Sequence, residues 1–422
     1  MKLNYKRTIL IGLAFLSISS FWQMYDNIIP LILKNSFGLG ETITGAVMAI
    51  DNVLALFLLP LFGTLSDKVD TKIGKRMPFI LGGTTLAVVL LTILGFANEA
   101  RNLTVFVVVL FFLLISMGLY RSPAVALMPD LTPKALRSKG NAIINLMGAV
   151  GGLFTLIMIK VLVGPGDTPT YVPLFTAVCL FMILSVGTLF LTIKEKTLRE
   201  AMPQEDEDRK EEPVSTQALP KEVKRSLAFI LVSISLWFTA YNAVTTAFSR
   251  YATHVWGLGN GGYANCLMMA TVAAIISYIP IGMISGKIGR KKTILLGITL
   301  ITLCYAVAGM FSSYHSIMVV FFAIIGFAWA AINVNSLPMV VEISAAGDVG
   351  KYTGFYYTFS MAAQVITPIL SGFLLENISY RTLFPYAVVF SLLSFCTMSM
   401  VKHGDAKPAK KESILENFDV ED

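Results

Sequence analysis

Gly63-Thr-Leu-Ser-Asp67-Lys68, which runs on to Gly74-Lys75-Arg76, is the stretch that decides how this chain folds. An apolar run of membrane-spanning length precedes it and another follows it. Because glycine permits a tight turn and cations stay on the cytoplasmic side of a bilayer, this stretch predicts a short cytoplasmic loop between two spans. A second version, Gly282-Met-Ile-Ser-Gly286-Lys287-Ile-Gly289-Arg290-Lys291-Lys292, begins 219 residues later. The recurrence at half the chain length predicts two copies of one membrane unit.

The composition places most of the chain in lipid. Of the 422 residues, 55% are hydrophobic and 14% are charged, and the mean hydropathy is +0.71. The net charge of +7 comes from cations in short loops between apolar runs, which is a topology signal and argues against a nucleic-acid partner. The four cysteines fall inside apolar runs, so we expect no disulfide framework. The first apolar run has no small-residue cleavage site and is expected to remain as a span.

Twelve apolar stretches are long enough to cross a membrane, since a span needs about 20 residues. They cover residues 9–33, 43–65, 78–97, 103–128, 140–163, 171–193, 226–250, 262–285, 293–312, 316–341, 352–375 and 380–401. With the N-terminus inside, 27 of the 33 Lys and Arg residues fall in cytoplasmic segments. The positive-inside rule therefore predicts a multi-pass protein of the cell membrane with both termini cytoplasmic.

The spans divide into two six-helix halves, residues 1–193 and 226–401, with a cytoplasmic tail from 402 to 422. Between the halves, residues 194–225 are rich in acidic and basic side chains, a composition that predicts a cytoplasmic linker without a core. The first span reads Phe21-Trp22-Gln-Met-Tyr25-Asp26, and the seventh reads Trp237-Phe238-Thr-Ala-Tyr241-Asn242 in the same register. An all-α membrane protein duplicated in this way is typical of secondary transporters.

These motifs resemble the major facilitator superfamily of secondary transporters. The longer stretch from Pro60 to Pro78 is similar to the sucrose/proton symporter branch and to the glycoside-pentoside-hexuronide:cation symporters, because this chain lengthens the loop between Asp67 and Gly74 as the sucrose branch does. The stretch that begins Arg121-Ser-Pro123 fits the same group. The resemblance covers all twelve spans. It implies two pseudo-symmetric six-helix bundles that transport a substrate by alternating access.

One departure from these relatives concerns the coupling ion. In the sodium-coupled melibiose-type carriers, acids stand at the positions that Ala55 and Leu59 occupy here. The acid that grips sugar on their fourth span aligns with Arg121. The sequence therefore favours proton coupling, or a substrate that needs a cation in its site.

Ionisable side chains within spans are costly and normally face a wet cavity or a partner. Asp26 and Asp51 lie in the outer halves of neighbouring spans, and we expect them to exchange the coupling proton, with Asp26 the favoured group. Arg121 offers a planar cationic fork to a pair of sugar hydroxyls or to a substrate carboxylate. For all three, the other interpretation is a structural contact between helices.

A sugar is held by hydrogen bonds to its hydroxyls and by an aromatic ring on its apolar face, so aromatic and amide residues that share a helix face are candidates for substrate binding. Amides in lipid also pair across helices, which is the other interpretation. Together with Arg121, the candidates are Trp22, Tyr25, Asn145, Tyr241, Asn242, Trp329, Asn333, Tyr357 and Gln364.

The two basic loops are expected to gate the cytoplasmic side. Asp67 would meet helix N-termini or arginines and hold that gate shut. Gly286 takes its place in the second copy, so we expect an unequal latch. The gating residues are Gly63, Asp67, Lys68, Gly74, Lys75, Arg76, Gly282, Gly286 and Arg290.

No enzyme, cofactor or metal site is predicted. The chain has no phosphate-cradling glycine motif, no His/Cys cluster with metal-ligand spacing and no nucleophile beside a base.

The sequence predicts a monomeric carrier in the lipid bilayer that takes up a small molecule, a sugar such as a disaccharide or glycoside, with a proton or other cation. Two other functions stay open: a proton-coupled exporter of drugs or metabolites, and a non-transporting membrane sensor that kept the fold.

Overall fold

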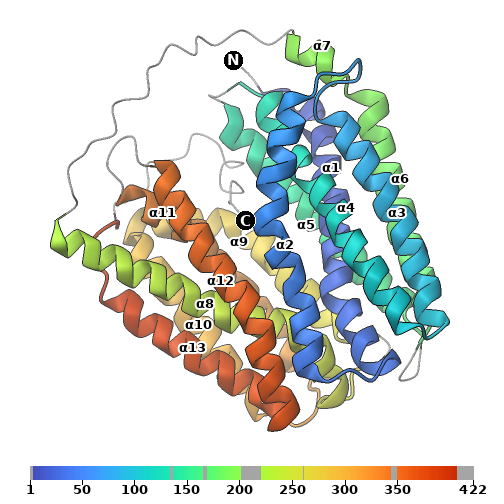
Figure 1. Cartoon of the computed structure of the whole chain (residues 1–422). Coiled ribbons are helices and arrows are strands. Elements are labelled where there is room, and N and C mark those ends of the chain that lie inside the picture. The colour runs from blue at the N-terminus through green and yellow to red at the C-terminus, as the bar shows by residue number, and fades with distance from the viewer. Residues whose placement is uncertain are drawn as a thin grey trace. The chain divides into compact units, whose positions relative to one another are not determined.

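The computed structural model describes residues 3–133, 136–164, 169–200, 220–259, 261–343 and 349–405. Within these ranges the chain is helical between short connections, and its only β-type pairing is an isolated bridge between Thr71 and Gly74. The helices, labelled in Figure 1, are α1 (Tyr5–Leu31) with a π-helical turn after it (Ile32–Ser36), α2 (Glu41–Lys68), α3 (Met77–Glu99), α4 (Leu103–Asp130), α5 (Arg137–Leu162), α6 (Val172–Thr192), α7 (Glu195–Glu200), α8 (Lys221–His254), α9 (Ala264–Ile288), α10 (Arg290–Met310), α11 (Ile317–Glu342), α12 (Val349–Asn377), a 3-10 turn (Tyr380–Thr382) and α13 (Leu383–Ser399).

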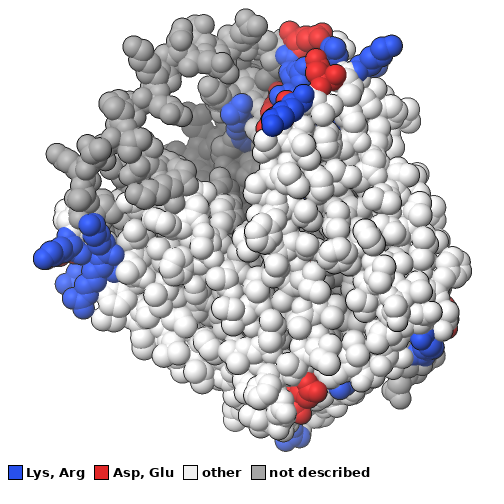
Figure 2. Space-filling view, in the orientation of Figure 1, with Lys and Arg blue, Asp and Glu red and all other residues white. Residues whose placement is uncertain are grey.

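Twelve helices in the described part of the chain are long and apolar enough to cross a membrane, which confirms the predicted number of spans. The short helix α7 is not among them. On the face that Figure 2 shows, the charged side chains of the described residues gather near helix ends, including those of α7 and the start of α8, and the flanks of the helices are uncharged. This is the distribution that a lipid solvent requires, because a charge in hydrocarbon is costly.

The segment between the sixth and seventh spans differs from the expected linker at both ends. Glu195–Glu200 forms α7, and α8 begins at Lys221 rather than at 226. The side chain of Glu195 is fully buried, so this residue is part of a packed structure. The rest of the expected linker, 201–219, and most of the expected tail, 406–422, lie outside the described residues.

The chain forms two compact units. Unit 1 has the bounds Met1–Gly40, Val47–Pro203 and Leu258–Met268, and unit 2 has the bounds Glu41–Ala46, Gln204–Gly257 and Met269–Asp422. The opening turns of α2 therefore pack as part of unit 2, and the opening turn of α9 packs as part of unit 1.

The two units repeat one packing pattern. In unit 1, α1 packs on α5 and α6, and α3 packs on α4 and α6. In unit 2, α8 packs on α12 and α13, and α10 packs on α11 and α13. In each unit the first long helix contacts the fifth and sixth, and the third contacts the fourth and sixth, as expected of a duplicated six-helix unit.

Small residues allow α1 and α5 to approach closely. A Cβ atom on Gly151 would lie 2.0 Å from the carbonyl oxygen of Leu16, so only glycine fits there. Across the same pair of helices, the hydroxyls of Ser20 and Thr155 are 2.7 Å apart and hydrogen bonded. Close packing at small residues with polar cross-links is the usual basis of helix association in lipid. This contact fixes where α1 presents its functional side chains.

Candidate functional site

Three helices of unit 1 surround a small cavity, called here the charged cavity. Trp22 of α1, Asp51 and Asn52 of α2, and Gly118 and Arg121 of α4 line it, together with apolar residues of α2 and α4. Its volume is about 30 Å³, which is room for a water molecule. The fold therefore brings two of the predicted ionisable residues and one predicted aromatic residue to a single place.

The charged groups of this cavity are near one another without forming a closed ion pair. The guanidinium carbon of Arg121 lies 5.9 Å from the centroid of the Trp22 ring, a cation–π arrangement. Asp51 Oδ1 accepts a hydrogen bond of 2.8 Å from Asn52 Nδ2. Asp26, on α1, interacts electrostatically with both Asp51 and Arg121. Among the described residues, no salt bridge joins Arg121 to either carboxylate.

Two buried polar atoms on α1 add to this cluster. Trp22 Nε1 and the Tyr25 hydroxyl are buried and have no hydrogen-bond partner among the described residues. The Tyr25 ring packs edge-on against Trp22, with 5.4 Å between the ring centroids. An unsatisfied buried donor costs about 1–3 kcal/mol, so both groups are suited to receive a water molecule or a substrate hydroxyl.

Unit 2 carries an uncharged counterpart, called here the aromatic group. Tyr241 of α8 stacks on Trp329 of α11 with 3.6 Å between centroids and 5° between planes. The ring of Phe238 stands edge-on to Trp329, with 5.5 Å between the ring centroids. The ring centroid of Tyr356, on α12, lies 6.4 Å from that of Phe238. The Tyr356 hydroxyl is 3.1 Å from Ser336 Oγ. A surface of this kind suits the apolar face of a ring-shaped ligand.

The remaining predicted substrate residues divide between the units. Asn242 follows Tyr241 on α8, and its Nδ2 atom is buried without a partner in the described part of the chain. Asn333 is 7% exposed on α11, one turn beyond Trp329. Tyr357 of α12 joins the aromatic group through an edge-on contact of 5.4 Å with Tyr356. Gln364 on α12 and Asn145 on α5 are half-buried.

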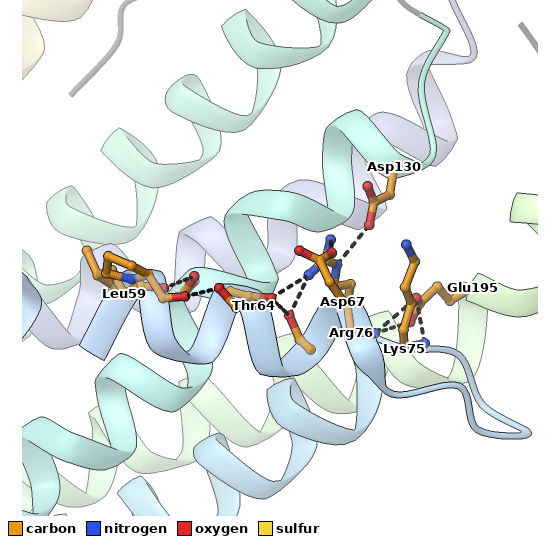
Figure 3. A network of polar contacts seen from close by, with 11 residues as sticks. Leu59, Thr64, Asp67, Lys75, Arg76, Asp130 and Glu195 are labelled. Atoms are coloured by element: carbon orange, nitrogen blue, oxygen red, sulfur yellow. Dashed lines mark hydrogen bonds and ion pairs between the residues drawn. The ribbon is translucent and has the colours of Figure 1, made fainter. Parts of the chain in front are cut away.

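The first basic loop is organised around Arg76, which is 4% exposed. Its Nε donates a hydrogen bond of 2.8 Å to Asp130, and its two Nη atoms contact Asp67, the Ser66 hydroxyl and the Gly63 carbonyl oxygen (Figure 3). The arginine that meets the predicted gating residue Asp67 thus comes from the same loop. Charge-assisted bonds to two carboxylates are strong ones, and they hold the ends of α2 and α4 to the start of α3.

Glu195 completes this loop, and sequence reasoning missed it. Its carboxylate accepts backbone N–H bonds from Lys75, Arg76 and Met77 at 2.8, 3.0 and 2.8 Å, where α3 begins. Gly74 has a φ of +117°, and a Cβ there would lie 2.2 Å from Glu195 Oε2. A carboxylate at a helix N-terminus is favourable because it satisfies free N–H groups and complements the helix dipole. The signal was an acid directly after the sixth span.

The second basic loop is built from similar parts with fewer charges. Asp405, which follows the last span as Glu195 follows the sixth, accepts a hydrogen bond of 2.8 Å from the Lys291 backbone N–H at the start of α10. Arg290 forms an ion pair with Glu342, and with no second carboxylate among the described residues. Gly286 stands where Asp67 stands in the first loop. The ion pairs of the two loops are therefore unequal, as the sequence predicts, while gating itself stays a prediction.

The other gating residues lie beside these contacts. Lys68 is the exposed last residue of α2. Gly282 lies in the final two turns of α9, and a Cβ on Gly286 would meet open space.

Unit 2 also contains a buried ion pair that sequence reasoning missed. Arg250 Nε lies 2.6 Å from Glu41 Oε2, and the two side chains are 3% and 0% exposed. The Tyr380 hydroxyl donates to the other oxygen of Glu41, and Arg250 Nη1 donates a 2.8 Å bond to the Thr246 carbonyl oxygen. No local pattern in the sequence pairs Arg250 with a residue 209 positions earlier.

Twelve apolar helices, built as two copies of a six-helix unit with charged and aromatic residues inside the spans, define a multi-pass membrane carrier. In the described residues, no group of three or more His, Cys, Asp or Glu side chains is arranged to hold a metal ion.

The chain belongs to the Major Facilitator Superfamily, whose family model matches residues 11–278 and 261–418. An uncharacterised MFS-type transporter of Methanocaldococcus jannaschii is 23% identical over 382 residues, which are 88% of this chain and 89% of that protein. A sucrose transport protein of Arabidopsis thaliana is 25% identical over 137 residues, 28% of this chain and 23% of that protein. The crystal structure of the nucleoside transporter NupG aligns with a TM-score of 0.70 at 14% identity, covering 94% of this chain and 100% of that one. The family and these relatives are transporters and not enzymes.

Proposed function

We propose that this transporter carries a sugar, a disaccharide or glycoside, together with a proton by alternating access. The observation that carries the proposal is the charged cavity. When both carboxylates are ionised, Asp26, Asp51 and Arg121 together carry one net negative charge inside a membrane unit, and a single proton neutralises it. A neutral cluster costs less free energy than a charged one when it is enclosed in the membrane. Proton binding can therefore control the conformational change that carries the substrate. The partial match to a sucrose transport protein supports a sugar as the substrate.

Each unit has a distinct part in this proposal. The carboxylate pair Asp26 and Asp51 takes up and releases one proton. Arg121 and the amide and hydroxyl groups of each unit are suited to bind sugar hydroxyls, and the aromatic group is suited to the apolar face of a sugar ring. The substrate residues are Trp22, Tyr25, Arg121 and Asn145 in unit 1, and Tyr241, Asn242, Trp329, Asn333, Tyr357 and Gln364 in unit 2.

The proposal includes an orientation. Both termini and both basic loops lie on the cytoplasmic face of the cell membrane, and the loops gate that face, with the first loop the stronger latch. A monomer is the transporting form. A cysteine introduced at Lys68 is then labelled by a membrane-impermeant maleimide only after the membrane is opened. Labelling of intact cells contradicts this orientation.

The function is tested with purified protein in liposomes. Radiolabelled disaccharides and glycosides are expected to accumulate when the outside is made acidic. The double variant Asp26→Asn/Asp51→Asn is expected to lose accumulation driven by the pH gradient while it retains counterflow, the exchange of labelled for unlabelled sugar. Sugar uptake that ignores the pH gradient, or no uptake of any sugar, contradicts the proposal.

The two other functions make different predictions in a thermal-stability screen of sugars, organic acids and cationic drugs, since a ligand that binds only the folded state raises the apparent melting temperature. An exporter is stabilised by drugs or metabolites and not by sugars. A sensor is stabilised by its ligand but shows no counterflow. A sugar symporter shows both stabilisation by a sugar and counterflow of that sugar.

A further inference from the structure

Asp26 and Asp51 occupy different positions relative to the charged cavity. Both interact electrostatically with Arg121. Asp51 lines the cavity together with Asn52, whereas Asp26 is not one of the lining residues. We infer that Asp51 is the group that takes the coupling proton and that Asn52 is the residue that positions it, an inference that rests on the proposed proton coupling.

The contact between Asn52 and Asp51 is unusual for neighbours in a helix. Consecutive helical residues point about 100° apart and do not normally face each other. The Asn52 amide nevertheless donates a 2.8 Å hydrogen bond to Asp51 Oδ1, and both residues line the same cavity. This bond fixes the plane of the carboxylate and engages Oδ1.

The cavity meets the requirements for a relay water. A buried water needs room and two to four polar partners. The volume of about 30 Å³ is sufficient, and Asp51, Asn52 and Arg121 supply polar atoms. Trp22, which also lines the cavity, has a buried Nε1 without a partner among the described residues. The cavity as it stands has room for a water molecule and not for a sugar ring, so a proton carried by water is what reaches Asp51 in this state.

The proposed step is a simple proton transfer. A hydronium ion from the solvent passes its proton to the Asp51 carboxylate, so that one O–H bond of hydronium breaks and one O–H bond forms at Asp51. A neutral water molecule remains. Release on the other side of the membrane reverses the step, with water accepting the proton. No electron is transferred.

The charges that face Asp51 favour a proton over a metal cation. Tyr25 and Asp26 face it from α1 and Arg121 from α4, while Asn52 is its neighbour on α2. Arg121 is a permanent cation that a sodium ion would have to approach. Once Asp51 is protonated, Asp26 and Arg121 balance each other and the cluster is neutral. The site therefore binds one proton.

The first test needs no substrate. The infrared difference spectrum of the liposome-embedded protein between alkaline and acidic pH reports the C=O stretch of a protonated carboxylic acid. The chain has 26 Asp and Glu residues, so the Asp51 component is the part of this band that is lost in Asp51→Asn. Asp26→Asn, the same chemical change one helix away, is the comparison variant: it is expected to retain this component with its midpoint at lower pH, because a neighbouring negative charge is removed.

Asn52 is tested as a positioning residue by the pH at which this band is half-formed. A hydrogen bond donated to a carboxylate stabilises its ionised form. Asn52→Leu, which removes the donor and keeps the approximate size, is expected to move the midpoint to higher pH by about one unit. Asn52→Gln, which keeps an amide donor, is expected to return the midpoint toward the wild-type value. A merely structural role for Asn52 leaves the midpoint unchanged.

Transport provides the second test. Asp51→Asn is expected to lose about tenfold or more of its gradient-driven uptake with counterflow intact. Asp26→Asn is expected to stay driven by the gradient but to need a more acidic outside, because it removes a negative charge that favours protonation of Asp51. The inference is overturned if the band and the coupling depend on Asp26 instead, or if Asn52→Leu leaves the midpoint in place. A wild-type protein that moves no sugar overturns the proposed function, whereas the infrared titration still decides between Asp51 and Asp26. If Asp51→Asn does not fold, the Asn52 and Asp26 variants decide.

Discussion

In unit 1, Asp51 and Arg121 line one water-sized cavity without touching, whereas in unit 2 Arg250 and Glu41 lie 2.6 Å apart and are almost completely buried. The unit 2 pair is also closed by other groups, since Tyr380 donates to Glu41 and Arg250 donates to the Thr246 carbonyl oxygen. A closed pair has few hydrogen-bonding positions left for a proton or a ligand. Burial alone therefore does not identify a functional charge, and the open cluster is the one suited to chemistry.

The same contrast appears when the two copies are placed in register. The register set by Tyr25 and Tyr241 puts Asn242 where Asp26 stands, and the register set by Gly63 and Gly282 puts Ala270 where Asp51 stands. Counting back from Pro129 and Pro338 puts Ala330 where Arg121 stands. The duplication thus kept the helices and their packing but not the charges. Four predictions test the comparison, in order of decreasing effect.

The closed pair should matter most for stability. Arg250→Ala leaves the buried carboxylate of Glu41 without its counter-ion, and the expected loss is about 3–5 kcal/mol in the free energy of unfolding. Thermal and denaturant unfolding of the purified protein measure it. The double variant Glu41→Leu/Arg250→Met is the control, because replacing both charges by apolar groups should recover much of the loss. A loss below about 1 kcal/mol for Arg250→Ala contradicts a structural role for the pair.

The open cluster should matter most for transport. Arg121→Ala leaves two carboxylates in the span without a cation, and the initial rate of uptake is expected to fall about 100-fold. The melting temperature should change much less than for Arg250→Ala, because Arg121 forms no closed pair. Arg121→Lys keeps the charge but not the planar fork, and should retain part of the activity. Unchanged substrate binding by Arg121→Ala would remove this residue from the site.

The two basic loops should differ in the same measurement. Arg76 bonds to two carboxylates and its side chain is 5% exposed, while Arg290 bonds to one and is 16% exposed. Arg76→Ala is therefore expected to cost about 2 kcal/mol of unfolding free energy, and Arg290→Ala about 1 kcal/mol or less. Equal losses in matched denaturant titrations would show that the first loop gains nothing from its second carboxylate.

The aromatic group should give the smallest effect. Trp329→Leu removes the stack on Tyr241, and the affinity for the transported sugar is expected to fall by roughly 1 kcal/mol, or about fivefold. Trp256→Leu is the matched control in unit 2, because Trp256 packs against Phe248 and Phe384 and is not part of the aromatic group. Titration calorimetry with the best-bound sugar measures both. Equal losses of affinity in the two variants contradict a substrate role for Trp329.

Much of the fold was predictable from the sequence because few backbone structures are stable in lipid. A chain in hydrocarbon must satisfy its backbone hydrogen bonds within each span, so an apolar run of sufficient length predicts a helix without knowledge of its neighbours. The twelve spans follow from that rule. α7 was read as the start of a linker because its composition is polar, yet Glu195 is fully buried and binds three backbone N–H groups at the start of α3. Composition reports the average surroundings of a segment and not the single contact that anchors it.

By itself the sequence determined the membrane setting, the twelve helices, the duplication and the short set of ionisable side chains within the spans. These are local properties, because hydropathy and loop charge act along a few turns of chain. Only the tertiary structure decided which of these side chains meet. It placed Asp51, Asn52, Arg121 and Trp22 around one cavity, and it joined Glu41 to Arg250 in a closed pair. The reason is physical: a contact between helices depends on their rotation and depth, which are set by packing at residues such as Gly151 rather than by the charged residues themselves.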